Sequence, residues 1–138
     1  MERVAKCLCG ESTVKVQGDP KFTAVCNCTN CQRRTGSAFG VSAYFPDTAI
    51  LETKGTWREY HEKNEHGNEV TTTFCERCGS TVFWKAQFIQ DHTGVAVGCF
   101  TDPEFPEPTV AVWNRSKLNW VAFPDHWHCM EKQVPKNA

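Results

Sequence analysis

Seven of the nine cysteines lie in three short groups that have the spacing of metal ligands. A Cys-x-x-Cys turn directs two thiolates at one ion about 2.3 Å away, and a glycine after the second cysteine lets backbone amides face sulfur. Four thiolates complete a tetrahedral structural zinc site, whereas three leave one position for a water, a thiol or a carbonyl oxygen, as catalysis requires. The groups are the first pair (Cys7 and Cys9), the triplet (Cys26, Cys28 and Cys31) and the last pair (Cys75 and Cys78).

Spacing alone leaves open which groups share an ion. In one arrangement the first and last pairs hold a structural ion, and the triplet forms a separate site with an open position. In another, Cys28 and Cys31 join the last pair in a zinc ribbon, every metal is structural, and the protein is a binding module. A redox role for Cys28 and Cys31 is a third interpretation, which the lack of a surrounding βαβ pattern disfavours.

Two arginines and a run of small residues follow the triplet directly. Arg33 and Arg34 could offset the negative charge of a thiolate site or bind a substrate carboxylate through the planar guanidinium fork. The alternative is a surface arginine that is bonded to a backbone carbonyl. Gly36 and Gly40 either permit close backbone approach to a metal or ligand, or only mark a turn into a strand.

Other residues with polar or aromatic side chains are expected to be structural. Cys99 and Cys129 lie outside the three groups and are expected to be small buried hydrophobes rather than ligands. His126 and His128 resemble a metal-binding tract by composition but are expected to be surface or packing residues. Four tryptophans at predicted strand positions are expected in the core: Trp57, Trp84, Trp113 and Trp120.

The elements that position these residues are predicted to be strands, so the chain is predicted to be mainly β. The only helical turn predicted is at residues 29–35, after Cys28, because no stretch of twelve residues has a clean 3.6 period. Short β-branched or aromatic runs occur at 13–17, 22–27, 38–45, 56–60, 69–74, 81–84, 95–100 and 110–113. Turn signals separate them at 18–20, 46–47, 54–55, 66–68, 91–94 and 101–108.

Composition favours one globular domain over residues 1–138, with 40% hydrophobic and 12% aromatic residues. A net charge of −1, from 15 basic and 16 acidic residues, argues against nucleic-acid and membrane-surface partners. The N-terminus lacks the apolar region of a secretory signal, and no window approaches the about 18 apolar residues of a membrane span. A cytoplasmic location is therefore expected, where thiols stay reduced and serve as metal ligands or reactive groups. The sequence predicts no oligomeric state.

The cysteine groups and their neighbours resemble the glutathione-dependent formaldehyde-activating enzyme family, which includes centromere protein V. The resemblance runs from about Cys7 to Trp120 and rests on C-x-C-G, then C-x-C-x-x-C with R-T-G-S-A-F at 34–39, then F-C-x-x-C-G-S at 74–80, and an acidic-Pro segment at 97–103. It implies a β-tent fold of twisted antiparallel sheets and two zinc ions per chain. The structural zinc is expected at the first and last pairs, and a catalytic-type zinc at the triplet.

The family reaction adds the thiol of glutathione to formaldehyde, giving S-hydroxymethylglutathione, and is a carbon–sulfur lyase reaction. The resemblance thus implies an enzyme with a small thiol and a small aldehyde as partners, with the triplet as its catalytic residues and Arg33 and Arg34 as candidates for the substrate carboxylate. Residues 71–73 are threonines before Phe74, where relatives often carry a basic residue that could anchor an anionic peptide. Because this anchor is missing, the expected thiol is glutathione or a similar one rather than glutathione alone. The alternative function is a non-catalytic, zinc-ribbon-like binding module.

Overall fold

The computed structural model of the chain describes residues 1–63 and 67–132. Within them, no helix has the length and apolar character needed to cross a membrane. The helix is α1 (Thr29–Thr35), and the 3-10 turns are η1 (Asp47–Ala49), η2 (Val97–Phe100) and η3 (Asn114–Ser116). The strands are β1 (Glu2–Lys6), β2 (Thr13–Gln17), β3 (Phe22–Cys26), β4 (Gly40–Pro46), β5 (Ile50–Lys54), β6 (Trp57–Lys63), β7 (Glu69–Cys75), β8 (Thr81–Ala86), β9 (Ile89–Ala96), β10 (Val110–Val112) and β11 (His128–Cys129).

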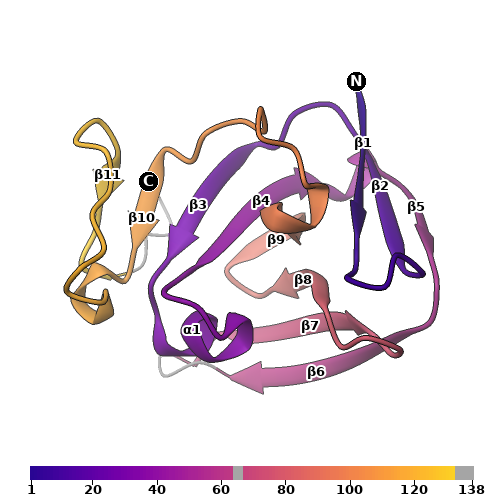
Figure 1. Cartoon of the computed structure of the whole chain (residues 1–138), viewed down its shortest axis with the longest axis horizontal. Coiled ribbons are helices and arrows are strands. Elements are labelled where there is room, and N and C mark those ends of the chain that lie inside the picture. Colours follow the sequence, from indigo (N-terminus) through magenta and orange to yellow (C-terminus); the bar gives the residue numbers. More distant parts are fainter. Residues whose placement is uncertain (64–66, 133–138) are drawn as a thin grey trace.

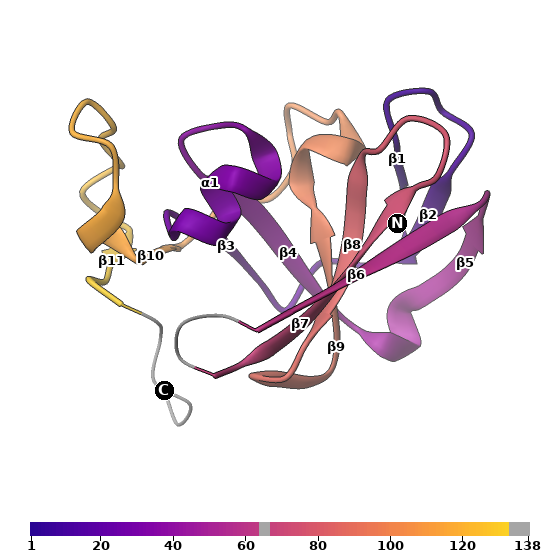
Figure 2. The ribbon, with the colours of Figure 1, turned by 90° about the horizontal axis from the view of Figure 1, so that it is seen from below.

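The strands form two twisted sheets (Figure 1), which confirms the predicted mainly β fold. The smaller sheet has the order β1-β2-β5, and the larger has the order β11-β10-β3-β4-β9-β8-β7-β6. Neighbouring strands are antiparallel except at β10, which runs parallel to β3 and β11. Seen from below (Figure 2), β10 and β11 lie at one end of the molecule, the small sheet lies at the other, and α1 stands between them.

The core contains side chains from both sheets. Val14 and Val16 of β2 are fully buried, as are Phe45 of β4 and Val95 of β9, because alternate residues of a strand point to one face. Each such side chain contributes about 1.5–3 kcal/mol when it leaves water. Two cysteines, Cys7 and Cys75, belong to the same buried cluster, so one of the cysteine groups is part of the core itself.

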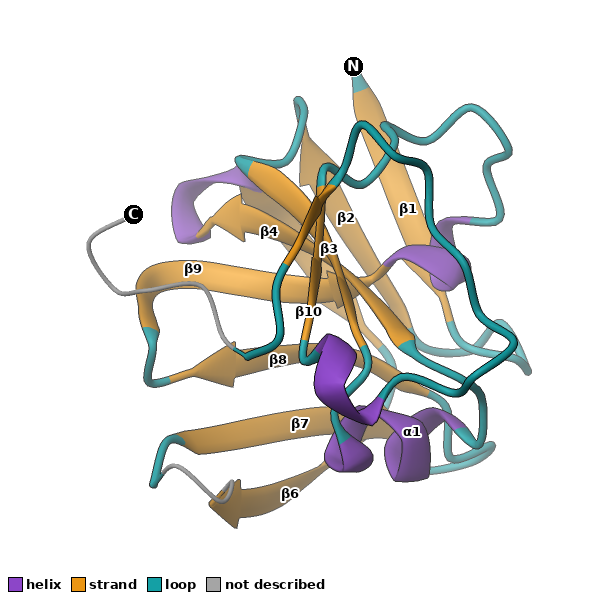
Figure 3. Cartoon of the chain, turned by 90° about the vertical axis from the view of Figure 1, so that its left-hand side faces the viewer, coloured by secondary structure: helices purple, strands orange, loops and turns teal. Residues whose placement is uncertain are grey.

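Most predicted elements are confirmed, and Figure 3 shows a body of strands with few helices outside it. The helical turn at 29–35 is α1, and the strand at 13–17 is β2; the other predicted strands overlap β3, β4, β6, β7, β8 and β10. The strand at 95–100 is wrong beyond residue 96, because residues 97–100 form η2. The predicted turn at 66–68 falls partly outside the described residues.

The turn predicted at 91–94 is also wrong, because these residues continue β9. Gly94 is in the strand for a packing reason: it pairs with Trp84 of β8, and any Cβ at this position would overlap the indole Nε1. A glycine inside a strand marks close approach by another group as often as a turn. Asp91, which has a positive φ of 59°, takes the strained backbone position of this segment.

Three strands were not predicted, namely β1, β5 and β11. β1 has three charged residues and one β-branched one, and β5 has two of each, so their composition gives a weak strand signal. Both pair with β2, which lies between them. Their extended form thus depends on backbone hydrogen bonds to a partner and on the burial of Ala5.

Two expectations about burial are wrong. Trp84 and Trp113 are buried and Trp57 is half-buried, but Trp120 is 76% exposed, because it lies in an irregular segment that runs over the surface. Cys129 is exposed too, since β11 is a two-residue strand at the edge of the larger sheet.

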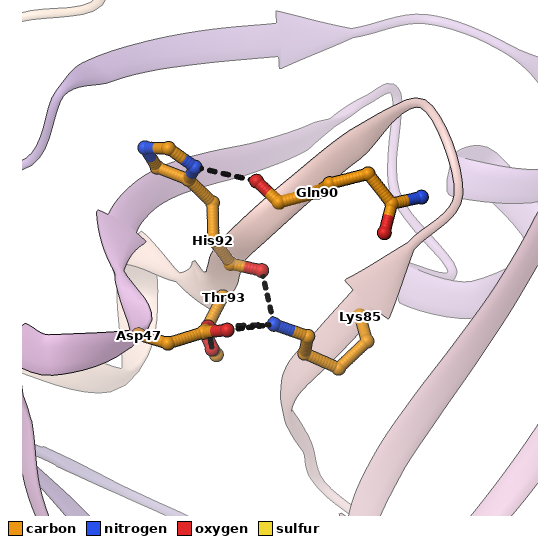
Figure 4. A network of polar contacts seen from close by, with 5 residues as sticks. All are labelled: Asp47, Lys85, Gln90, His92 and Thr93. Atoms are coloured by element: carbon orange, nitrogen blue, oxygen red, sulfur yellow. Dashed lines mark hydrogen bonds and ion pairs between the residues drawn. The ribbon is translucent and has the colours of Figure 1, made fainter.

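A polar network connects η1, which follows β4, to the β8–β9 hairpin (Figure 4). Asp47 of η1 pairs with Lys85 of β8 at 2.6 Å and accepts a 2.7 Å hydrogen bond from Thr93. Lys85 also donates to the backbone oxygen of His92, whose ring lies 2.8 Å from the backbone oxygen of Gln90. These hydrogen bonds lower the pKa of the Asp47 carboxyl, although its partial burial acts in the opposite direction.

Candidate metal centres

The first and last cysteine pairs meet in space although 66 residues separate Cys9 from Cys75. The four Sγ atoms lie within 4.8 Å of one another, with 3.5 Å between Cys7 and Cys9 and 3.8 Å between Cys9 and Cys75. A tetrahedral ion with metal–sulfur bonds of about 2.3 Å requires sulfurs about 3.8 Å apart. The four-cysteine group, meaning these two pairs, therefore fits a closed zinc site.

Two serines support the sulfurs of the four-cysteine group. Ser12, which is fully buried, donates from its backbone to Cys7 Sγ at 3.3 Å and from its hydroxyl to Cys75 Sγ at 3.2 Å. The hydroxyl of Ser80 lies 3.3 Å from Cys78 Sγ and lowers the pKa of Cys78 to about 5. Donors aimed at sulfur stabilise the thiolate form, which is the form that binds a metal.

Both turns of the four-cysteine group use a glycine in the left-handed region. Gly10 and Gly79, the residues after the second cysteine of each pair, have φ near 80° and donate to the carbonyl oxygens of Cys7 and Cys75. A side chain would strain this conformation, which closes each turn and brings the two thiols of a pair to one side.

The triplet lies where β3 passes into α1. Cys26 is the last residue of β3, and Cys28 is the N-cap of α1, where its sulfur accepts a 3.3 Å hydrogen bond from the backbone of Cys31. The three Sγ atoms lie within 4.8 Å of one another, and all three side chains are half-buried. The triplet therefore fits an ion that keeps one coordination position open to solvent or substrate.

Shared hydrogen bonds make the three thiols unequal. Hydrogen bonds with Cys26 and Cys31 lower the pKa of Cys28 to about 3, although the burial of Cys28 acts in the opposite direction. The pKa of Cys26 is raised by its hydrogen bonds to the other two sulfurs and by burial. A divalent cation that binds such a cluster displaces the shared protons and takes all three sulfurs as thiolates.

Arg34 lies beside the triplet, and its guanidinium stacks on Trp84 at 4.5 Å from the ring centroid. A hydrogen bond to Cys28 and burial raise the pKa of Cys31, and the positive charge of Arg34 acts in the opposite direction. Trp84 is held in turn by a 3.3 Å hydrogen bond from its indole to the hydroxyl of Tyr44, whose pKa burial raises to about 12. A cation–π contact fixes the guanidinium without using its five N–H donors. Since these donors form no hydrogen bond within residues 1–63 and 67–132, they are available to a ligand.

Each of the two glycines near Arg34 matches one of the predicted alternatives. Gly40 permits close approach: a Cβ there would lie 2.6 Å from Arg34 Nη2 and 3.5 Å from Cys31 Cβ. Gly36 marks a turn, because it ends α1 in the left-handed conformation and no neighbour lies within 4 Å of its Cβ position.

A cavity of about 340 Å³ is lined by residues that neighbour cysteines of both groups, although none of the seven grouped cysteines lines it. Arg34 and Gly40 contribute from beside the triplet and Ser80 from beside Cys78, and Cys99 of η2 also lines it. This volume is at the lower end of the range for small-molecule sites. Arg34 is half-buried and lines the cavity, whereas Arg33 is exposed and does not line it.

Several predicted alternatives can now be compared with the geometry. Among the described residues, the Sγ atoms of a zinc ribbon from Cys28, Cys31 and the last pair do not form one group. His126 and His128 belong to neither cysteine group; His126 instead hydrogen bonds Glu107 at 2.6 Å.

Several residues that surround the cysteines were not predicted to have a role. Ser12 and Tyr44 contribute through contacts that no local spacing reveals, and Cys99 was expected only to be a buried hydrophobe. Ser80 had a local signal, because it directly follows Cys78 and Gly79.

Comparison with known proteins gives a family and a fold. A family model described as glutathione-dependent formaldehyde-activating enzyme matches residues 2–116, which include all seven grouped cysteines. A crystal structure of a Rhodobacter sphaeroides protein is similar, with a TM-score of 0.56 and 19% identity over 76% of this chain and 91% of that chain. At this identity the likeness shows the fold alone. None of the curated proteins is significantly similar to the chain.

Proposed function

The chain belongs to the glutathione-dependent formaldehyde-activating enzyme family, and from this premise we propose that it is a carbon–sulfur lyase that joins a small thiol to a small aldehyde at the triplet. The thiol is glutathione or a similar one, and the product is an S-hydroxymethyl-type adduct. A sulfur–carbon bond forms as the carbonyl π bond breaks, and the thiol proton ends on the former carbonyl oxygen. The reaction therefore needs no oxidant or reductant.

The observation that carries the proposal is a cluster of three thiols beside Arg34, whose stacked side chain also lines a cavity. We assign two zinc ions to each chain, a structural one to the four-cysteine group and a second one to the triplet. Zinc at the triplet supplies, when bound, a centre that lowers the pKa of a thiol and polarises a carbonyl oxygen. Because the four-cysteine group has no open position, the chemistry belongs at the triplet.

The chain's own residues have two tasks in this proposal. Arg34 binds the carboxylate of the thiol substrate through its unused N–H donors, and its charge favours thiolate over thiol nearby. Phe39 and Val41 contribute apolar surface to the cavity wall, which limits water around the reacting carbonyl. Cys99 lines the same cavity, where burial raises the pKa of its thiol and keeps it protonated, so it does not compete as a nucleophile.

The proposal is tested with cobalt in place of zinc. Glutathione is expected to change the visible absorption bands that arise from the triplet and to leave those from the four-cysteine group unchanged. Formaldehyde added next should be consumed faster than by the same concentration of glutathione without protein. This comparison is required because thiols and aldehydes combine unaided.

Cys28→Ser provides the control for this test, and its rate gain should vanish. A protein that leaves both the spectrum and the rate unchanged when glutathione is added would contradict the proposal. In that case a binding module with purely structural zinc becomes the better description.

Arg34 and Arg33 form a matched pair for testing the carboxylate contact. Arg34→Gln is expected to raise KM for glutathione about 10–100-fold, since hydrogen bonds to a charged group contribute about 1.5–3 kcal/mol. Arg33→Gln should change it by less than about 2-fold, because its side chain is exposed away from the cavity. A neutral thiol such as 2-mercaptoethanol distinguishes the two roles of Arg34. Equal losses with both thiols would mean that Arg34 only offsets the charge of the triplet.

A further inference from the structure

Asn27, which lies between two cysteines of the triplet, is fully buried. Its side-chain amide donates to the backbone oxygen of Val112 at 3.0 Å and to the side-chain oxygen of Asn114 at 2.8 Å. Its backbone N–H donates to the same Val112 oxygen at 3.0 Å. The peptide that separates Cys26 from Cys28 is therefore fastened to β10 and η3, which come more than 80 residues later.

The backbone oxygen of Asn27 is held as firmly as its amide. It accepts hydrogen bonds from Gln32 Nε2 at 2.8 Å and from Ser116 Oγ at 2.9 Å. The Gln32 amide also donates to the backbone oxygen of Ser116 at 3.0 Å. We call Asn27, Gln32 and Ser116 the amide clamp. Since Asn27 follows Cys26 and Gln32 follows Cys31, the clamp connects both ends of the triplet to η3.

Helix α1 has little else to hold it in place. It has seven residues, none of which is buried, so apolar packing contributes little to its position. Stacking of Arg34 on Trp84 is the other described side-chain contact that anchors it to a sheet. The four-cysteine group differs, because Cys7 and Cys75 are buried in the core. The positions of Cys28 and Cys31 thus depend on polar contacts that the other group does not need.

The buried amide of Asn27 has a cost that an apolar residue would avoid. Its Oδ1 accepts no hydrogen bond among the described residues. Leaving such an atom buried without a partner costs about 1–3 kcal/mol. The two hydrogen bonds that its Nδ2 donates explain why an amide occupies this position, because they add a side-chain anchor to the backbone hydrogen bonds that hold the turn between the first two cysteines.

We propose that the three residues of the amide clamp, Asn27, Gln32 and Ser116, are positioning residues for the second metal site. The amide clamp holds the three sulfurs at the mutual distances that a cation requires, and its loss weakens metal binding at the triplet without affecting the four-cysteine group. This inference rests on the proposed function only in taking the triplet as a metal site. Residues that orient metal ligands typically change metal affinity by about 10–100-fold when they are replaced.

The test measures cobalt affinity at both sites of the same protein by competition with a chelator. Asn27→Ala and, as a second variant with a half-buried side chain, Gln32→Ala are compared with Asn30→Ala. Asn30 is a matched control because it lies in α1 between Cys28 and Cys31 and its side chain makes no hydrogen bond among the described residues. We expect triplet affinity to fall about 10–100-fold in the first two variants, and neither site to change in the control.

The ratio of the two affinities separates positioning from general destabilisation. The inference would be overturned if cobalt affinity fell by the same factor at the triplet and at the four-cysteine group. It would also be overturned if Asn27→Ala and Gln32→Ala bound cobalt at the triplet as tightly as Asn30→Ala does. Either result would leave the proposed function standing. If the unaltered protein binds no cobalt at the triplet, the proposed function fails and the inference falls with it. If Asn27→Ala does not fold, Gln32→Ala decides by the same ratio.

Discussion

Cys78→Ser is expected to leave a chain that aggregates or shows no cooperative unfolding transition. Two sulfurs of the four-cysteine group lie inside the main buried cluster, so the metal and the core depend on each other. Structural zinc contributes about 10–16 kcal/mol in small zinc-binding peptides, which is as much as the entire stability of a typical domain, about 5–15 kcal/mol. Loss of one of four ligands removes a large part of that energy. Circular dichroism during a thermal scan, with zinc present, measures the outcome.

Two other serine substitutions show whether the loss is specific. Cys28→Ser removes a ligand from a half-buried group on a helix without buried residues, so it should stay soluble and unfold cooperatively within a few degrees of the unaltered protein. Cys129→Ser removes an exposed thiol from the edge strand and should change nothing. Identical unfolding of Cys78→Ser and Cys28→Ser would favour the zinc-ribbon interpretation, in which both cysteines hold one structural ion.

Graded chelation is expected to remove two zinc ions in two separate stages. The first ion should leave the triplet under mild chelation without a change in far-UV circular dichroism, because three half-buried sulfurs hold it and one position is open. The second should leave the four-cysteine group only with stronger chelator or denaturant, and the chain should unfold as it leaves. Zinc content per chain and ellipticity, recorded on the same samples, measure both stages.

Cys28→Ser again serves as the control for chelation. It should start with about one zinc per chain, lack the first stage and retain the second. A single zinc in the unaltered protein, with no further uptake when zinc is added, would contradict the two-site assignment. Release of both ions together with unfolding would show that the triplet is structural as well.

The sequence by itself determined the fold class, the cysteine groups and the family. These depend on local signals, namely residue alternation, turn residues and the short spacing within each cysteine pair, which act over a few residues. The helical turn at 29–35 is an example, because Cys28 caps it and Gly36 ends it within the same segment. The order of the motifs also led to the family that the comparison found over residues 2–116.

Spacing left open which cysteines meet, and only the family resemblance chose between the arrangements; the tertiary structure shows how they meet and which arginine lines the cavity. Cys9 and Cys75 come together because β1 and β7 bring their ends to one side of the core, a long-range pairing that no local pattern encodes. Arg33 and Arg34 are equivalent in sequence, and stacking on Trp84 of β8 distinguishes them. Gly94 follows the same principle, since its strand position is explained by an indole on the neighbouring strand. Spacing along the chain predicts the chemistry of a site, whereas contacts between distant strands place the residues that support it.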